Sequence, residues 1–222
     1  MSYDTEEQQV ERLKEWWNEN GTPLIVGAIL GLGGFAGWKY WTQQQVNYQQ
    51  SASDLYNKVS EVLKSSDKAS LVESAEAVKS GYPDSAYAAL AAFHLAQAAV
   101  EAKELDKAAG ELNWVIKANI SPEFVATAKI RLARILIEQE KAEQALLLLS
   151  FEADDAYYSL ASLIKGDALT SLGRNEEALQ AYQAASSNLS IAARNATLQL
   201  KIDQLSAVDH QPVIEEILKE SN

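Results

Sequence analysis

The feature that most restricts the fold of this chain is a run of nineteen residues without a charged side chain, between Glu19 and Lys39. As an α-helix it spans roughly 28 Å, at about 1.5 Å per residue, close to the ~30 Å hydrocarbon thickness of a bilayer. Aromatic side chains gather just outside both ends: Trp16, Trp17, Trp38, Tyr40 and Trp41. Such clusters are typical of the headgroup layers. We therefore predict a membrane-spanning helix at residues 20–41, preceded by an acidic tail at residues 1–19.

Two other interpretations of this segment are less favourable. A buried helix in a soluble protein would carry its six glycines at a cost of about 1 kcal/mol each relative to alanine. A cleaved secretory signal has a short basic start, whereas the residues before this segment are rich in glutamate. An uncleaved anchor remains the prediction.

The glycines of the predicted span are spaced for helix packing. Gly27 and Gly31 are four residues apart, and so are Gly33 and Gly37. Each pair leaves a flat strip on which a second helix can approach closely. We predict that these strips contact another helix in the membrane, which could come from a second copy or from another protein.

The composition of the remaining chain excludes several classes of function. The formal net charge is −12, which opposes nucleic-acid binding because that requires basic patches. There is no cysteine, so neither a disulfide framework nor a cysteine-ligated metal is expected. The two histidines, His94 and His210, lie far apart in the sequence. We predict no metal and no cofactor.

Residues 42–66 contain neither proline nor glycine and many good helix formers. We expect the membrane helix to continue through them as a helical stalk. The stalk leads into a soluble domain at residues 67–222.

A repeat is the strongest pattern in this domain. Small residues recur at Ala96, Ala133 and Gly166, spaced 37 and then 33 residues apart. Twelve residues after each comes an alanine, and four residues later a large side chain: Ala108, Ala145 and Ala178, then Leu112, Leu149 and Tyr182. The pattern resembles the tetratricopeptide repeat, a helix-turn-helix unit of 34 residues. We predict an all-α chain, in which the transmembrane helix precedes a tetratricopeptide-repeat-like solenoid with flanking helices at about 42–80 and 189–220.

Stacked repeats present a concave face that is built by the first helix of each pair. By repeat position, this face carries the candidate partner-binding residues Phe93, Gln97, Glu101, Ile130, Arg134, Glu138, Leu163, Asp167 and Thr170. Their mixture of apolar and charged groups suits a bound peptide or helix. The alternative is that several of them are ordinary core or solvated positions.

Groups that could support catalysis are scarce. The sequence has no phosphate-binding loop, nucleophile elbow or metal-ligand cluster. His94 has no cysteine, serine or carboxylate at a suggestive spacing, so we interpret it as a histidine at the edge of the core. Asp154 and Asp155 are more simply explained by a favourable charge at a helix N-terminus than by a metal. We predict that the protein is not an enzyme.

The whole chain resembles the YfgM family of ancillary SecYEG translocon subunits. The resemblance rests on the acidic tail, on a span that reads NGTPLIVGAILGLGGFAGWKYW, and on LARILIEQEKAEQALLLL in the repeat domain. It implies a single-pass protein of the bacterial inner membrane, with the tail in the cytoplasm and the repeat domain in the periplasm. It also implies association with SecYEG and with the periplasmic chaperone PpiD, and contact with emerging client polypeptides.

We therefore expect a membrane-tethered, non-enzymatic interaction module that helps to pass translocated proteins to periplasmic chaperones. Two alternatives stay open. The cytoplasmic tail could hold a soluble regulatory protein, or the repeat domain could serve as a scaffold for envelope assembly or division.

Overall fold

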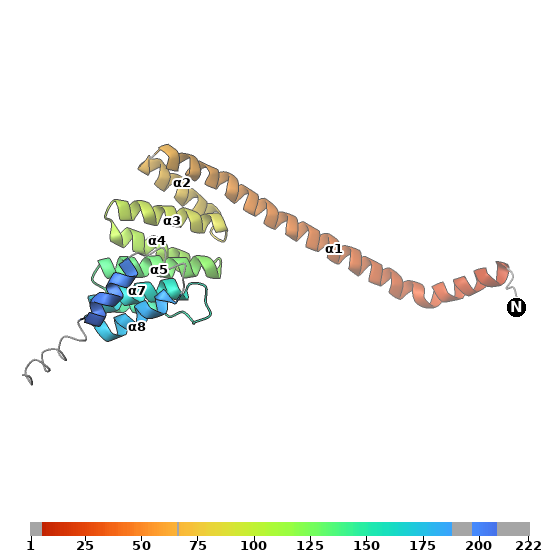
Figure 1. The fold of residues 1–222 in the computed structure, drawn as a ribbon. Coiled ribbons are helices and arrows are strands. Elements are labelled where there is room, and N and C mark those ends of the chain that lie inside the picture. Colours follow the sequence, from red (N-terminus) through yellow and green to blue (C-terminus); the bar gives the residue numbers. More distant parts are fainter. Residues whose placement is uncertain (1–5, 66, 188–196, 208–222) are drawn as a thin grey trace, which may run out of the picture. The chain divides into compact units, whose positions relative to one another are not determined.

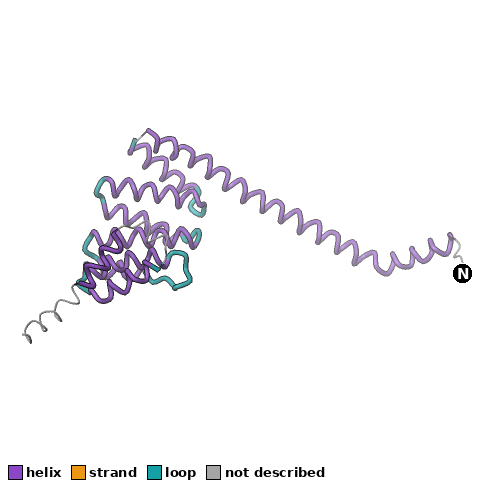
Figure 2. Tube along the Cα trace, in the orientation of Figure 1, coloured by secondary structure: helices purple, strands orange, loops and turns teal. Residues whose placement is uncertain are grey.

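The computed structural model of the chain describes residues 6–65, 67–187 and 197–207. Every regular element in these ranges is a helix, and the described residues include no strand (Figure 2). This confirms the predicted all-α fold. The rest of the predicted tail and of the C-terminal flank, including His210, lies outside the described residues.

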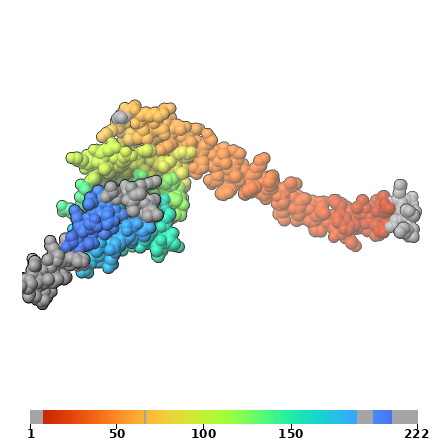
Figure 3. Space-filling model, in the orientation of Figure 1, coloured from red at the N-terminus to blue at the C-terminus, as the bar shows by residue number. Residues whose placement is uncertain are grey.

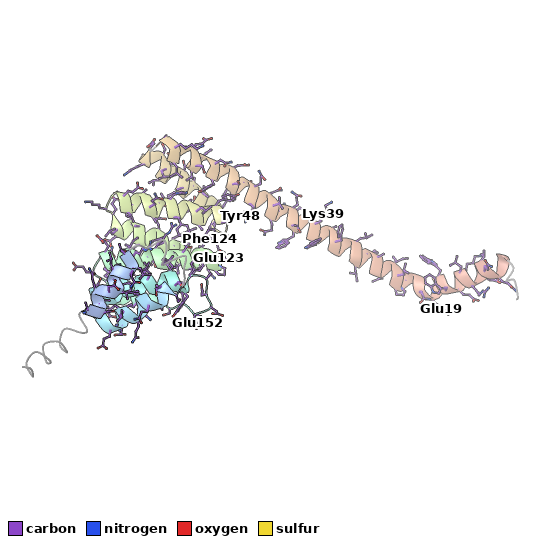
Figure 4. The ribbon with its side chains drawn as sticks, viewed as in Figure 1. Glu19, Lys39, Tyr48, Glu123, Phe124 and Glu152 are labelled. Atoms are coloured by element: carbon purple, nitrogen blue, oxygen red, sulfur yellow. The ribbon has the colours of Figure 1, made fainter. Side chains whose placement is uncertain are left out.

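The first helix, α1 (Glu6–Ser65), contains the predicted span together with the described parts of the tail and the stalk (Figure 1). It bends near Glu19 (Figure 4). Pro23 lies inside this helix. A proline has no N–H to donate, and its ring collides with the carbonyl group four residues earlier, here that of Glu19. The bend therefore has a specific cause at the predicted border between tail and span.

No side chain between Glu19 and Lys39, both labelled in Figure 4, is charged, and residues 22–38 are exposed. The large ones are Leu24, Ile25, Val26, Ile29, Leu30, Leu32 and Phe35. Within the described part of the chain, α1 is the one helix long and apolar enough to cross a membrane. An exposed apolar surface of this length suits a lipid environment, because water would oppose its exposure.

Contacts divide the chain into two compact units, Met1–Ser51 and Ala52–Asn222. The second unit is built from α2 (Lys68–Gly81), α3 (Ala86–Glu101), α4 (Leu105–Ala118), α5 (Pro122–Glu138), α6 (Ala142–Leu148), α7 (Tyr158–Ser171) and α8 (Asn175–Ser186). Residues 197–207 form a further helical segment. The end of α1 belongs to this unit, because Val59 is fully buried against Leu71 and Val78 of α2. Residues 52–65 of the predicted stalk are thus the first helix of the folded unit.

Three consecutive helix pairs, α3–α4, α5–α6 and α7–α8, share one turn geometry. The second residue after the first helix of each pair is left-handed: Lys103 (φ 60°), Glu140 (φ 61°) and Gly173 (φ 71°). In every case the next amide donates to the carbonyl group five residues earlier, as in Glu104 to Ala99 (2.8 Å), Lys141 to Leu136 (2.8 Å) and Arg174 to Leu169 (2.9 Å). These bonds satisfy carbonyl groups that the helix end leaves free. The turns recur at the same 37- and 33-residue spacing as the sequence repeat.

One of these turns offers a test of backbone strain. Glu140 occupies a left-handed conformation that a side chain disfavours and glycine adopts freely. We expect Glu140→Gly to raise the free energy of unfolding by about 1 kcal/mol. As a control, Gln144→Gly inside α6 should lower it by about 1 kcal/mol. Urea unfolding followed by circular dichroism measures both, and destabilisation by Glu140→Gly would contradict the explanation.

The repeated positions form the interface inside each pair. Ala96, Ala133 and Gly166 are buried on the first helices, and Ala108, Ala145 and Ala178 are buried on the second ones. The large partners Leu112, Leu149 and Tyr182 are also buried. The two helices of each pair are in contact, as close crossing over small residues allows, and Figure 1 shows α3 beside α4. The repeat predicted from the sequence is therefore the repeat of the fold.

The helical segment at residues 197–207 covers the end of the stack. Its Leu198 is buried in the same cluster as Ile130 of α5 and Leu163 of α7, with Ile202 and Leu205 packed against them. In Figure 3 the blue atoms of this segment lie against the cyan atoms of α8. An end unit of a helical stack needs such a cover, because its apolar face has no following repeat.

Candidate functional site

A hollow of about 350 Å³ lies between α3 and α5, the first helices of two successive pairs. It is lined by Phe93, Ala96, Gln97, Val100, Leu112, Arg131, Arg134 and Ile135. We call this set the α3/α5 hollow. Its volume is near the lower end of the about 300–1,000 Å³ that is usual for ligand pockets.

Helical spacing explains why these residues meet. Phe93, Gln97 and Val100 follow each other at i, i+4 and i+7 on α3, so they share one face. Arg131 and Arg134 lie at i and i+3 on α5. The buried Ala96 leaves room between the helices, and the buried Leu112 of α4 forms part of the apolar floor. The sequence thus produces an apolar floor with a charged rim on the α5 side.

Each rim has its own contacts. On the α5 side, the guanidinium carbon of Arg131 lies 4.7 Å from the centre of the Phe93 ring. That ring in turn packs against Phe124, at 6.1 Å between ring centres. On the α3 side, the amide nitrogen of Gln97 donates to a carboxylate oxygen of Glu101 at 3.1 Å. The α5 rim is therefore cationic, whereas on the α3 rim Glu101 already accepts a hydrogen bond from Gln97.

The structure brings together only some of the predicted partner-binding residues. Phe93, Gln97 and Arg134 line the α3/α5 hollow, and Glu101 bonds to one of its residues. Glu138 is exposed near the end of α5. Thr170 is exposed, and its hydroxyl donates to the Gly166 carbonyl at 2.9 Å.

Three of the predicted partner-binding residues have other roles. Ile130 and Leu163 are 3% and 4% exposed in the core cluster that also contains Leu198, so they offer no surface to a partner. Asp167 accepts hydrogen bonds from the Tyr182 hydroxyl (2.7 Å) and from Lys201. The segment at residues 197–207 shares this core cluster through Leu198, and its Lys201 bonds to Asp167. The repeat pattern does not encode this additional segment.

Arg131 belongs to the site although it was not among the predicted residues. Its position three residues before Arg134 is the signal that could have identified it, since residues at i and i+3 are neighbours on a helix. Its charge also affects His94, whose pKa is lowered by burial and by the nearby guanidinium of Arg131.

His94 has the contacts of a structural residue. Its Nε2 lies 2.9 Å from the hydroxyl of Tyr56 at the end of α1, and the two rings are stacked at 6.2 Å. Burial raises the pKa of Tyr56. His94 therefore joins α3 to the last turns of α1, as expected for a histidine at the edge of the core. No group of three or more metal-ligating side chains occurs in the ranges that the structure describes.

The glycine strips of the span are open within the chain. A methyl group placed on Gly27, Gly31, Gly33 or Gly37 would meet no other heavy atom within 4 Å. Gly34 is equally open, and it follows Gly27 and Gly31 at i+7 and i+3. The described part of the chain thus leaves the close-approach surface of these glycines uncovered.

Comparison with known proteins agrees with this architecture. Residues 14–207 match the family model described as a tetratricopeptide repeat-like domain. The chain is 34% identical over 205 residues to an ancillary SecYEG translocon subunit of Escherichia coli (strain K12), covering 92% of this chain and 98% of the relative. The chain belongs to the YfgM family of ancillary SecYEG translocon subunits.

Two further YfgM relatives carry the same description. The protein from Aggregatibacter actinomycetemcomitans is 29% identical over 206 residues, 92% of this chain and 100% of the relative. The one from Haemophilus influenzae is 26% identical over 186 residues, 83% and 91% of the two chains. In each case the similarity covers most of both chains.

Proposed function

We propose that this YfgM protein is a membrane-tethered, non-enzymatic interaction module that works at the SecYEG translocon. In this proposal α1 anchors the chain in the inner membrane with a cytoplasmic tail. The repeat domain lies in the periplasm, where it binds PpiD and helps to pass client polypeptides to periplasmic chaperones. The observation that carries the proposal is the joining of an apolar, uncharged helix to a stack of helix pairs, in a chain similar to translocon subunits along nearly its whole length.

Tethering supplies the mechanism. A domain that is held beside the translocon meets emerging chains at a high effective concentration, without any additional contact energy. Arg12 and Lys14 precede the span, and Lys39 and then Lys58 follow it, with Lys58 well beyond its end. The basic residues nearest to the span favour a cytoplasmic N-terminus, although only weakly.

The glycine strips provide the test of translocon association. We expect leucine at Gly27 and Gly31, or at Gly33 and Gly37, to reduce co-purification of SecYEG from detergent-solubilised membranes several-fold, because added side chains prevent close helix approach. The matched control is leucine at Ala28 and Ala36, which places the same two leucine side chains at neighbouring positions of the span. Undiminished co-purification of SecYEG by both glycine variants would exclude the strips as the contact.

A second candidate function concerns the tail. Val10, Leu13 and Trp17 follow each other at i, i+3 and i+7 on α1 and are exposed. Such a stripe could hold a soluble regulatory protein in the cytoplasm. Deleting residues 2–15 separates the two functions, because this deletion should remove regulation alone and leave translocon association intact.

A further inference from the structure

The α3/α5 hollow of this acidic protein presents two arginines that pair with no carboxylate in the described ranges. The formal net charge is −12, from 31 acidic and 19 basic side chains. Arg174, by contrast, forms a two-point ion pair with Glu177, at 2.7 Å and 2.6 Å. Arg131 and Arg134 form no hydrogen bond or ion pair with any described residue. The two arginines of this rim are therefore available to an acidic ligand, although the chain carries more acidic than basic side chains.

The position of Arg131 leaves its donors accessible. Its guanidinium group lies over the Phe93 ring, which holds the planar group by a cation–π contact. An arginine that is stacked in this way still has N–H groups along its edge for a carboxylate. Because the ring restrains the side chain, less conformational entropy is lost when an acid binds.

The floor beside this rim is apolar and partly uncovered. Val100 is 45% exposed, and it lines the hollow together with Phe93, Leu112 and Ile135. A large apolar side chain placed there would remove this surface from water. The opposite rim offers Gln97, whose neighbour Glu101 would repel a second carboxylate on that side. The charges therefore orient a bound segment, with its acids toward α5.

We propose that the α3/α5 hollow binds an acidic amphipathic segment of a partner protein. One large apolar side chain of the segment fills the hollow, and its carboxylates contact Arg131 and Arg134. This proposal rests on the proposed function, because it names the chemistry that the repeat domain recognises in its periplasmic partner or client. Recognition of an amphipathic segment through apolar anchors and matched charge is an established binding mode of helical grooves.

The test uses the full-length protein in a mild detergent and two labelled synthetic peptides. The peptides have equal length and the same apolar pattern, with glutamate at the polar positions of one and lysine at those of the other. Fluorescence anisotropy measures their dissociation constants. We expect the glutamate peptide to bind at least about tenfold more tightly in about 50 mM salt, and this preference to shrink in about 500 mM salt.

Variants assign the binding to the hollow. Arg131→Glu with Arg134→Glu should abolish or reverse the charge preference. Lys68→Glu with Lys165→Glu is the matched control, since it makes the same change in net charge at exposed positions outside the hollow. Val100→Trp should weaken both peptides by filling the hollow without altering any charge. Circular dichroism establishes that each variant is folded.

The outcomes separate this inference from the proposed function. Equal binding of the two peptides, or an unchanged preference in the double arginine variant, would overturn the acidic-segment proposal. Equal loss of preference in the lysine control would also overturn it, because binding would then follow overall charge. Co-purification of SecYEG depends on the span and would be retained in each of these cases, so it tests the proposed function alone.

Discussion

Replacing Gly166 with alanine is expected to lower the free energy of unfolding by about 2 kcal/mol. A methyl group there would lie 2.8 Å or less from three atoms of the Tyr182 ring. An overlap with three ring atoms belongs at the upper end of the about 1–3 kcal/mol that overpacking costs, and the better helix propensity of alanine recovers only about 1 kcal/mol. The ring cannot withdraw easily, because its hydroxyl is bonded to Asp167 and Lys201 lies over its face.

Gly110 provides the matched control for this change. It lies inside α4, it is exposed, and a methyl group on it would meet nothing within 4 Å. Gly110→Ala should therefore stabilise the fold by about 0.5–1 kcal/mol. Urea unfolding of the full-length protein in detergent, followed by circular dichroism, compares the two variants. Equal stabilisation by both would contradict the close packing of α7 on α8.

Replacing Leu112 with alanine is expected to have the second large effect, a loss of about 3 kcal/mol. Leu112 is 1% exposed, and it packs at the centre of the cluster formed by α3, α4 and α5. Deleting a fully buried leucine side chain typically costs about 2–5 kcal/mol, from lost burial and from the cavity that remains. The same change enlarges the α3/α5 hollow, whose floor Leu112 forms.

The control for Leu112 lies on α6. Leu147 is 80% exposed, so Leu147→Ala should change the free energy of unfolding by less than about 0.5 kcal/mol. The unfolding midpoint in urea again measures the difference. A loss below about 1 kcal/mol for Leu112→Ala would mean that the repeat interface is far looser than its burial indicates.

The sequence predicts the repeat architecture well, because its spacing reports packing directly. Alanine or glycine at residues 96, 133 and 166 is required wherever two helices cross closely, and a large side chain must then fill the space beside it. The left-handed turns are harder to predict from the sequence. Gly173 suggests one of them, but Lys103 and Glu140 occupy the same conformation without being glycines.

The candidate site is only partly predictable, for a physical reason. Repeat position identifies which residues of α3, α5 and α7 lie on one face, but it cannot tell what covers that face. The segment at residues 197–207 shares a core cluster with Ile130 and Leu163 and bonds to Asp167 through Lys201, although its own sequence does not continue the repeat. Only Phe93, Gln97 and Arg134 of the predicted set therefore line the hollow.

Crosslinking and mass spectrometry on native membranes tests the central claim most directly. The proposal predicts that Lys14 and Lys39, which flank the span, crosslink to SecYEG, and that Lys103 and Lys129, on the domain, crosslink to periplasmic chaperones. The opposite result would be an abundant full-length protein in the soluble fraction after a carbonate wash, or the lack of any crosslink from Lys14 and Lys39 to SecYEG. Either finding would contradict an anchored module that works at the translocon.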